Sequence, residues 1–179
     1  QGLASQVDFQ GIIELVGDKI REVFNWPNMG IRIYDPKTNL VHYPYELERG
    51  VRLPPFDPIP AGAFSGHIIR TRKPLLINRD MDGWMEKLHS SLLPGTEQSK
   101  SFLGVPIISG DQVTGVIAVE DIEREDAFGE SDVRLLTTLA ASMGVALENA
   151  RLFNETNRLL AETKQRAAAE KKAHKATLG

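Results

Sequence analysis

The sequence predicts an α+β fold in which helices at both ends flank a central run of antiparallel strands. Three observations support this prediction. Apolar residues in 7–24 recur at spacings of three and four, which is typical of a helix. The middle of the chain holds short apolar runs separated by turn residues, which is typical of strands. Residues 130–175 contain no proline and only one glycine, so they can form one very long helix.

The composition excludes several classes of site. The net charge is −3, and no basic segment in the central portion could neutralise phosphates, so we expect no nucleic-acid partner. The chain has no cysteine, which excludes disulfides, thiolate metal ligands, thiol nucleophiles and cysteine-linked chromophores. No apolar run approaches eighteen residues and no signal peptide is visible, so we expect a cytoplasmic protein without direct membrane contact. The missing initiator Met suggests an excised fragment.

The first predicted helix has one narrow apolar seam, suited to packing lengthwise on another helix. Its members are Phe9, Ile13, Val16, Ile20 and Val23. Pro27 disfavours helical dihedral angles at the preceding residue, so the helix should end near residue 25.

The next segments predict strands and short helices. Residues 29–34 and 40–45 form strands joined by a turn-rich pentapeptide, which indicates a hairpin. Residues 52–60 contain four prolines and predict an extended loop. The remaining expected elements are a short helix over 65–71, a short strand over 74–78, a helix over 82–92 capped by Asp82, and a loop over 94–99.

Residues 103–121 predict a second hairpin, turned by Gly110 and Asp111. In the simplest register Ile108 faces Val113, Val105 faces Val116, and Pro106 faces Gly115. Apolar residues occupy both parities of the strands, so we expect both faces of this hairpin to be covered.

The last predicted helix begins after Gly129, with Asp132 near its N-terminus and Phe128 packing on Val133. Its apolar face is broad at first and then narrows to a seam in which the spacing between apolar residues alternates strictly between three and four. Asn157 and Lys164 interrupt that seam, which otherwise has coiled-coil spacing.

Four stretches together resemble a GAF domain over roughly residues 5–160: GIRIYDPKTNLVHY, SGHIIRTRKPLLINRD, SFLGVPIISGDQVTGVIAVED and AFGESDVRLLTTLAASMGVALENARLF. The resemblance implies a central antiparallel sheet of five or six strands. It also implies that the terminal helices pack on one face, while loops and short helices on the other face form a pocket. Such domains often precede a histidine kinase or nucleotide cyclase in bacterial signalling proteins.

The resemblance also implies a division of the chain into three parts. Residues 1–25 would be a dimerisation helix, 26–150 the GAF-like sensory domain, and 151–179 a signalling helix or coiled-coil linker. Phe128 and Asp132 match the motif of cyclic-nucleotide-binding members, but Glu120 and Asp121 stand where those members have an Asn-Lys pair. Bilin attachment and methionine-sulfoxide reduction both need a cysteine, which this chain lacks.

Six of the candidate pocket residues have a structural alternative. Helix capping explains Ser65, turn chemistry explains Asn78 and Asp80, core packing explains Tyr34 and Trp84, and a solvent-facing position explains His67. The complete candidate set is Tyr34, Phe64, Ser65, His67, Asn78, Asp80, Trp84 and Ser101. The histidines lack metal-ligand spacing, and we predict neither a metal site nor catalytic residues; the cofactor is unknown.

These observations favour a regulatory module over an enzyme. We expect it to bind an unidentified small molecule and to form a homodimer linked covalently to an output domain. The expected dimer interface comprises Phe9, Ile13, Val16, Ile20, Val23, Met143, Ala146, Ala150, Phe153 and Leu160. Two alternatives remain open: a ligand-free dimerisation spacer, and a small-molecule enzyme using His67 with the acidic cluster that follows the second hairpin.

Overall fold

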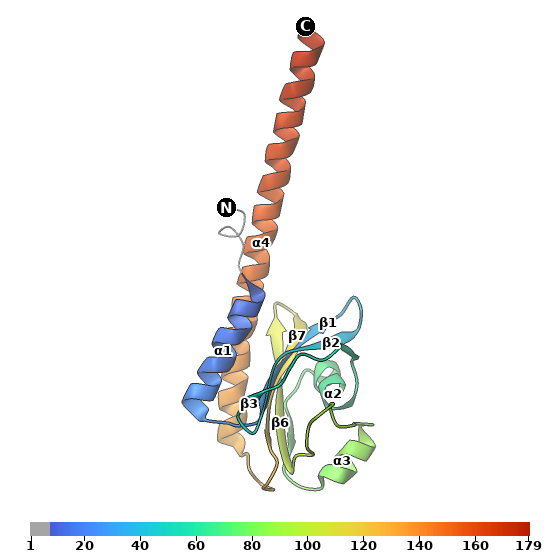
Figure 1. Cartoon of the computed structure of the whole chain (residues 1–179), viewed down its shortest axis with the longest axis vertical. Helices are drawn as coiled ribbons and strands as arrows, with labels where there is room; N and C mark the ends of the chain where they lie inside the picture. Colours follow the sequence, from blue (N-terminus) through green and yellow to red (C-terminus); the bar gives the residue numbers. More distant parts are fainter. Residues whose placement is uncertain (1–7) are drawn as a thin grey trace.

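The computed structural model describes residues 8–179 and has the predicted α+β architecture. A central sheet separates two helical layers (Figure 1). In chain order the elements are α1 (Phe9–Phe24), β1 (Met29–Asp35), β2 (Leu40–Glu48), β3 (Val51–Arg52), β4 (Ile59–Pro60), α2 (Ala63–Thr71), β5 (Leu75–Ile77), α3 (Met81–Lys87), β6 (Ser101–Ser109), β7 (Gln112–Asp121) and α4 (Glu130–Leu178).

The sheet has seven strands, whereas five or six were expected. Its order is β3-β2-β1-β7-β6-β5, β4 pairs with β2, and all pairs are antiparallel. The two additional strands come from the proline-rich segment predicted as a loop. Its two ends pair with β2 as the two-residue strands β3 and β4. Both strands are short because the prolines that separate them cannot donate a backbone hydrogen bond to β2.

The terminal helices α1 and α4 lie side by side on one face of the sheet, as expected, and α2 and α3 lie on the other (Figure 1). The face covered by α1 and α4 carries the larger core, including Ile31, Tyr45 and Leu103, which are almost completely buried. Strand alternation therefore sends neighbouring residues, such as Arg32 and Glu46, to the opposite face.

The β6–β7 hairpin differs from the predicted register. Ile108 faces Val113 as expected, but Val105 faces Ile117, and Val116 faces Pro106. The cause is a bulge at Thr114, whose hydroxyl donates to the Ile107 carbonyl at 3.3 Å. A local side-chain hydrogen bond of this kind is invisible to a simple count of alternating residues.

Two helix boundaries also differ from expectation. Asp80, and not Asp82, caps α3, since its Oδ1 accepts from the backbone N–H of Gly83 at 3.2 Å. The helix then ends at Lys87 instead of continuing to residue 92. At the other end of the chain, Asp8 caps α1, and the expected helical position Val7 lies outside the described residues.

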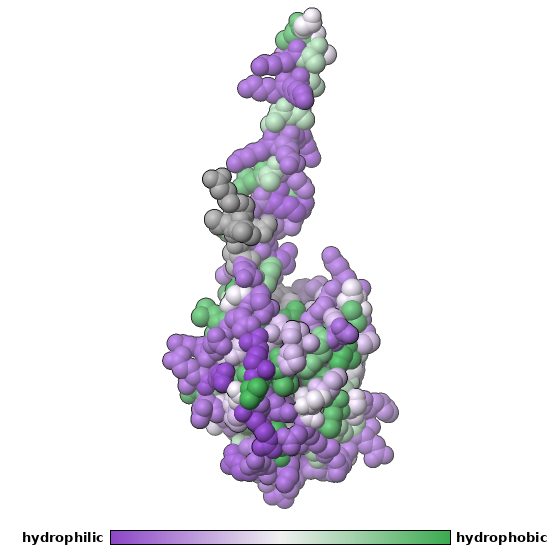
Figure 2. Space-filling view, in the orientation of Figure 1, coloured by the Kyte–Doolittle hydropathy of each residue, from purple (hydrophilic) through white to green (hydrophobic). Residues whose placement is uncertain are grey.

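Helix α4 is much longer than the sheet it covers. Asp132 accepts from the backbone N–H of Gly129 at 2.9 Å, which fixes the first turn. Beyond residue 155 the helix continues away from the globular body, and mainly hydrophilic side chains interrupted by hydrophobic ones coat it (Figures 1 and 2). Among residues 8–179, no helix has the length and apolarity needed to cross a membrane.

The residues expected at the dimer interface fall into two groups. Ile13, Ile20, Met143 and Ala150 are buried inside the protomer, so they do not offer a surface to a second chain. The reason is that α1 and α4 pack on each other and on the sheet, and this packing buries part of the apolar seam of both helices. Val16 and Ala146 are half-buried, whereas Phe9, Val23, Phe153 and Leu160 are exposed.

Candidate functional site

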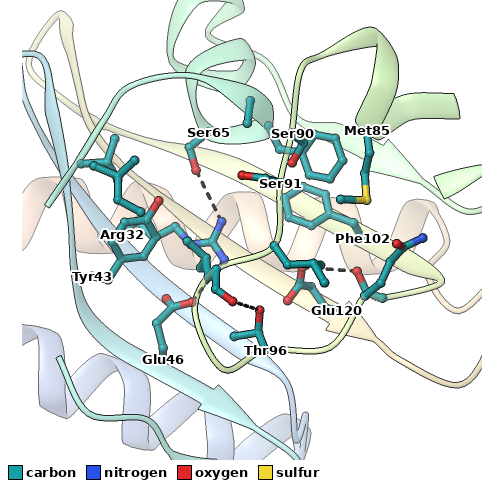
Figure 3. A pocket seen from close by; sticks show the side chains of 18 of the residues that line it. Arg32, Tyr43, Glu46, Ser65, Met85, Ser90, Ser91, Thr96, Phe102 and Glu120 are labelled. Atoms are coloured by element: carbon teal, nitrogen blue, oxygen red, sulfur yellow. Dashed lines mark hydrogen bonds and ion pairs between the residues drawn. The ribbon is translucent and has the colours of Figure 1, made fainter. Parts of the chain in front are cut away.

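A cavity of about 260 Å³ lies on the sheet face opposite α1 and α4. Side chains of β1, β2 and β7 form its floor, and the N-terminal turn of α2 forms one wall. Residues 89–93 and 96–99, which lie between α3 and β6, contribute a covering wall (Figure 3).

A buried ion pair lies on the floor of this cavity. Arg32 Nη2 lies 3.2 Å from Glu46 Oε1, and both side chains are only 8% exposed. Arg32 Nη1 donates to Ser65 Oγ at 3.4 Å, and the guanidinium lies 5.5 Å from the ring centroid of Tyr43. Arg32 therefore joins β1 to β2 and to the first turn of α2 (Figure 3).

The hydrogen-bonding capacity of this pair is not fully used. Arg32 Nε and Glu46 Oε2 are buried and have no hydrogen-bond partner within residues 8–179. Burial raises the pKa of Glu46 to about 7, although Arg32 opposes the shift. Burial alone would lower the pKa of Arg32, but attraction from Glu46 and Glu120 outweighs it and raises that pKa. The floor thus carries an energetic cost that packing alone does not require.

Local backbone features bring these two side chains together. Gly30 faces Glu46 across the β1–β2 pair, and a Cβ at Gly30 would lie 2.6 Å from one Glu46 carboxylate oxygen and closer to the other. Only glycine leaves room there for the carboxylate. The β1–β2 register also shifts between Ile31 and Ile33, which places Tyr43 and Pro44 in an irregular stretch of β2.

A second carboxylate, Glu120, lies at the end of β7. Its Oε1 accepts from Ser99 Oγ at 3.3 Å, and burial raises its pKa above the usual value. Its cross-strand neighbour on β6 is Phe102. Glu120 therefore presents a carboxylate beside an aromatic ring on the floor of the cavity (Figure 3).

Polar contacts at the rim hold the covering segment in place. Arg49 Nε donates to Glu97 Oε2 at 2.6 Å, and Arg49 Nη1 to Glu123 Oε1 at 3.1 Å. The backbone N–H of Glu97 donates to Glu48 Oε1 at 2.8 Å. Because these contacts are largely exposed, each contributes little stability to the covering segment.

Much of the remaining wall is apolar. Phe64 and Phe102 pack with ring centroids 5.0 Å apart and planes tilted by 51°. Around them lie aliphatic and thioether side chains: Val41, Leu47, Leu53, Ile59, Met81, Met85, Leu92 and Leu93. The cavity can therefore hold a small molecule with an apolar body and at least one polar group.

Of the eight candidate pocket residues, Phe64 and Ser65 line the cavity. Six lie elsewhere, and four of these make structural hydrogen bonds. Asn78 binds the backbone of Phe128, with Nδ2 donating to its carbonyl at 2.7 Å and Oδ1 accepting from its N–H at 3.3 Å. Ser101 Oγ donates to a backbone carbonyl at 2.7 Å, Tyr34 binds Asn39, and Asp80 caps α3.

Trp84 and His67 also lie outside the cavity lining. Trp84 packs at the edge of the smaller core, with the ammonium of Lys87 4.9 Å from its ring centroid. His67 lies on α2, half-buried, and its Nδ1 has no hydrogen-bond partner within residues 8–179. Across those same residues, no three histidine, aspartate or glutamate side chains are grouped so as to hold a metal ion.

The charged residues of the floor, Arg32, Glu46 and Glu120, were not among the predicted pocket residues. A signal for Arg32 existed, because it is the one charged residue in the apolar run of β1. A charge within such a run either faces solvent or lines a polar site, and the sequence does not distinguish these cases. Only the spatial order of β2, β1 and β7 brings the three residues to one face.

Known proteins share this architecture. The structure of a methyl-accepting chemotaxis protein superimposes with a TM-score of 0.70 at 18% identity, covering 81% of this chain and 92% of that chain. The blue-light absorbing form of the Thermosynechococcus elongatus PixJ GAF domain gives 0.65 at 17% identity, covering 87% and 94%. Free methionine-R-sulfoxide reductase from Neisseria meningitidis, in complex with its substrate, gives 0.60 at 19% identity, covering 82% and 81%.

Structural likeness at these identities shows the fold, and a sequence comparison shows the family. The profile of the GAF domain matches residues 6–148, which is most of the chain. The matched segment includes α1, every strand, and the part of α4 that covers the sheet. This chain therefore belongs to the GAF domain family.

Proposed function

We propose that this GAF domain is a sensor module that encloses a small molecule in the cavity above β1, β2 and β7. In a homodimer, α4 would transmit the conformational change that binding causes to an output domain outside this chain. GAF domains are in general regulatory sensor modules, and those of signalling proteins are linked to output domains. The observation that carries the proposal is the buried Arg32–Glu46 pair on the cavity floor.

The buried pair favours a binding site over a filled core. Moving each charge out of water costs several kcal/mol, which its partner offsets only when the remaining hydrogen bonds are also made. Here Arg32 Nε and Glu46 Oε2 remain unpaired. A spacer domain needs only apolar side chains at these positions, whereas ionisable groups with perturbed pKa values are typical of functional clefts. Two of the similar structures come from proteins whose names state light absorption or a bound substrate.

The distal part of α4 supports dimeric transmission. Leu152 and Leu159 lie seven residues apart, as do Phe153 and Leu160, and all four are about half exposed. A spacing of seven places each pair on one stripe of the helix, which suits parallel pairing with α4 of a second copy. A ligand that binds one arrangement of the dimer more tightly would shift the population toward it.

The ligand part of the proposal is tested on the protein as purified. An absorption spectrum is recorded, and the small molecules released on denaturation are identified by mass spectrometry. A compound present at about one equivalent per chain supports the sensor function and identifies the ligand class. A blank, combined with no thermal stabilisation by a metabolite library, would instead favour the dimerisation spacer.

The dimer is tested by sedimentation at several protein concentrations. Exchanging Leu152 and Leu159 for serine removes one exposed stripe of α4 and is expected to weaken the dimer by at least about tenfold. Val51→Ser, an exposed apolar position on β3, is the matched control and should leave association unchanged. Equal association of all three proteins would contradict this interface.

A further inference from the structure

The ionisable side chains that line the cavity are unequal in sign. Arg32 is the one Lys or Arg side chain of the lining, whereas the carboxylates are Glu46, Glu48, Glu97 and Glu120. Arg32 pairs with Glu46, and Arg49 pairs with Glu97 from outside the cavity. Within residues 8–179, Glu48 and Glu120 form no ion pair. The lining therefore carries an excess of negative charge.

Glu120 is the better placed of these two carboxylates to meet a ligand. Glu48 already accepts the backbone N–H of Glu97 at the rim. Glu120 uses only one oxygen, toward Ser99. Its other oxygen has no hydrogen-bond partner in the described part of the chain, and its cross-strand neighbour Phe102 makes this end of the floor apolar.

Glu46 adds a second negative charge next to the cavity. Its side chain is only 8% exposed, and its Oε2 lies buried without a partner against Gly30, so a ligand in the cavity does not touch this oxygen. An ammonium held by Glu120 is nevertheless attracted to this charge, because the interior screens charges weakly. Burial raises the pKa of both Glu46 and Glu120, and a bound cation would lower both.

The apolar walls fix the rest of the ligand. Phe64, Phe102, Met81 and Met85 surround the charged floor. Besides Arg32 the lining holds no Lys or Arg that could receive an acid group, and its one histidine, His89, lies on the covering segment. A volume of about 260 Å³ admits a molecule of the size of an amine with one ring or a short branched chain.

We infer that the cavity recognises a small organic cation, a protonated amine on an apolar body, whose ammonium is received by Glu120. This inference rests on the proposed sensor function. It predicts selectivity by charge: the cation binds, while a neutral or anionic molecule of the same shape binds weakly. The Arg32 guanidinium stays with Glu46 and Ser65 and positions the Glu46 carboxylate.

The test uses three probes of matched shape: 2-phenylethylamine, 2-phenylethanol and phenylacetate. Binding to the full chain is measured by saturation-transfer NMR and calorimetry at neutral pH. The amine is expected to bind at least about tenfold more tightly than either of the others, as one charge-assisted hydrogen bond provides. An equal or stronger affinity for the alcohol or the acid overturns the inference.

Two variants localise the effect. Glu120→Gln keeps the shape of the side chain and its contact with Ser99 but removes the charge, so it should weaken amine binding about tenfold and leave the alcohol unaffected. Glu125→Gln removes an exposed carboxylate outside the cavity and should change neither. Amine binding that is unchanged in Glu120→Gln would overturn the inference.

The outcomes separate this inference from the proposed function. A neutral or anionic compound released from the purified protein, or preference for a neutral or anionic probe, overturns the charge selectivity and leaves the sensor function standing. No released compound, no binding of any of the three probes and no thermal stabilisation by the metabolite library would together overturn both.

Discussion

Replacing Gly144 by alanine should destabilise the protein, although alanine is the better helix former. Gly144 lies where α4 crosses β6, and a Cβ there would lie 3.0 Å from the carbonyl carbon of Ile108 and closer still to its oxygen. Carbon atoms pack best at about 3.5–4.0 Å, so α4 must move away from β6 by roughly 0.5–1 Å. That movement also strains the buried hydrogen bond from Ser109 Oγ to the Gly144 carbonyl.

The expected change in the free energy of unfolding is the difference between a gain in helix propensity and a cost of overpacking. Alanine gains about 1 kcal/mol over glycine in a helix interior. An added methyl in a packed core costs about 1–3 kcal/mol, and the upper end applies here because the opposing atoms are backbone. We therefore expect Gly144→Ala to lower the free energy of unfolding by about 2 kcal/mol.

Gly11→Ala is the matched control on α1. Its added Cβ would meet only Asp8, at ordinary contact distances of 3.5–3.6 Å, so the propensity gain of about 1 kcal/mol should appear in full. The free energies of unfolding of both variants are measured by urea unfolding at one protein concentration. The signal is the fluorescence of Trp26, which packs between Phe24 and Phe128. The reasoning is refuted if Gly144→Ala is as stable as Gly11→Ala.

Two further predictions concern the cavity floor. Arg32→Met leaves Glu46 buried without its partner and should cost about 3 kcal/mol in urea unfolding, while the double variant with Glu46→Gln should recover most of it; a double variant no better than the single would contradict a pairing role. Since burial raises the pKa of Glu46 from 4.5 to about 7, the folded protein retains a proton that the unfolded chain releases in that range. Glu46 therefore lowers stability as the pH rises from 4.5 to 7, and Glu46→Gln should flatten the decline in unfolding free energy; a decline as steep in the variant as in the wild type would count against it.

The elements of the fold can be predicted from the sequence better than the residues of the site. Helices α1 and α4 and both hairpins have local signals, since apolar spacing and turn residues act within a few positions of each other. The register of β6 and β7 failed at one bulge, because Thr114 satisfies its hydroxyl locally and leaves the ladder. The floor of the cavity depends instead on which strands are neighbours, and that order follows from the packing of the whole sheet.

The sheet lies between the cavity and the terminal helices, and its strands contact both. Glu46 faces the cavity, while its neighbour Tyr45 faces the helices, packs against Gly17 and donates its hydroxyl to Asp18 of α1 at 2.8 Å. A Cβ at Gly17 would lie 2.5 Å from the Tyr45 ring, so the contact has no slack. We therefore expect a ligand that shifts Glu46 to displace Tyr45 and with it α1, because a close-packed interior transmits strain between adjacent residues of one strand. Since α1 packs along α4, a displacement of α1 would reach α4 through one further contact.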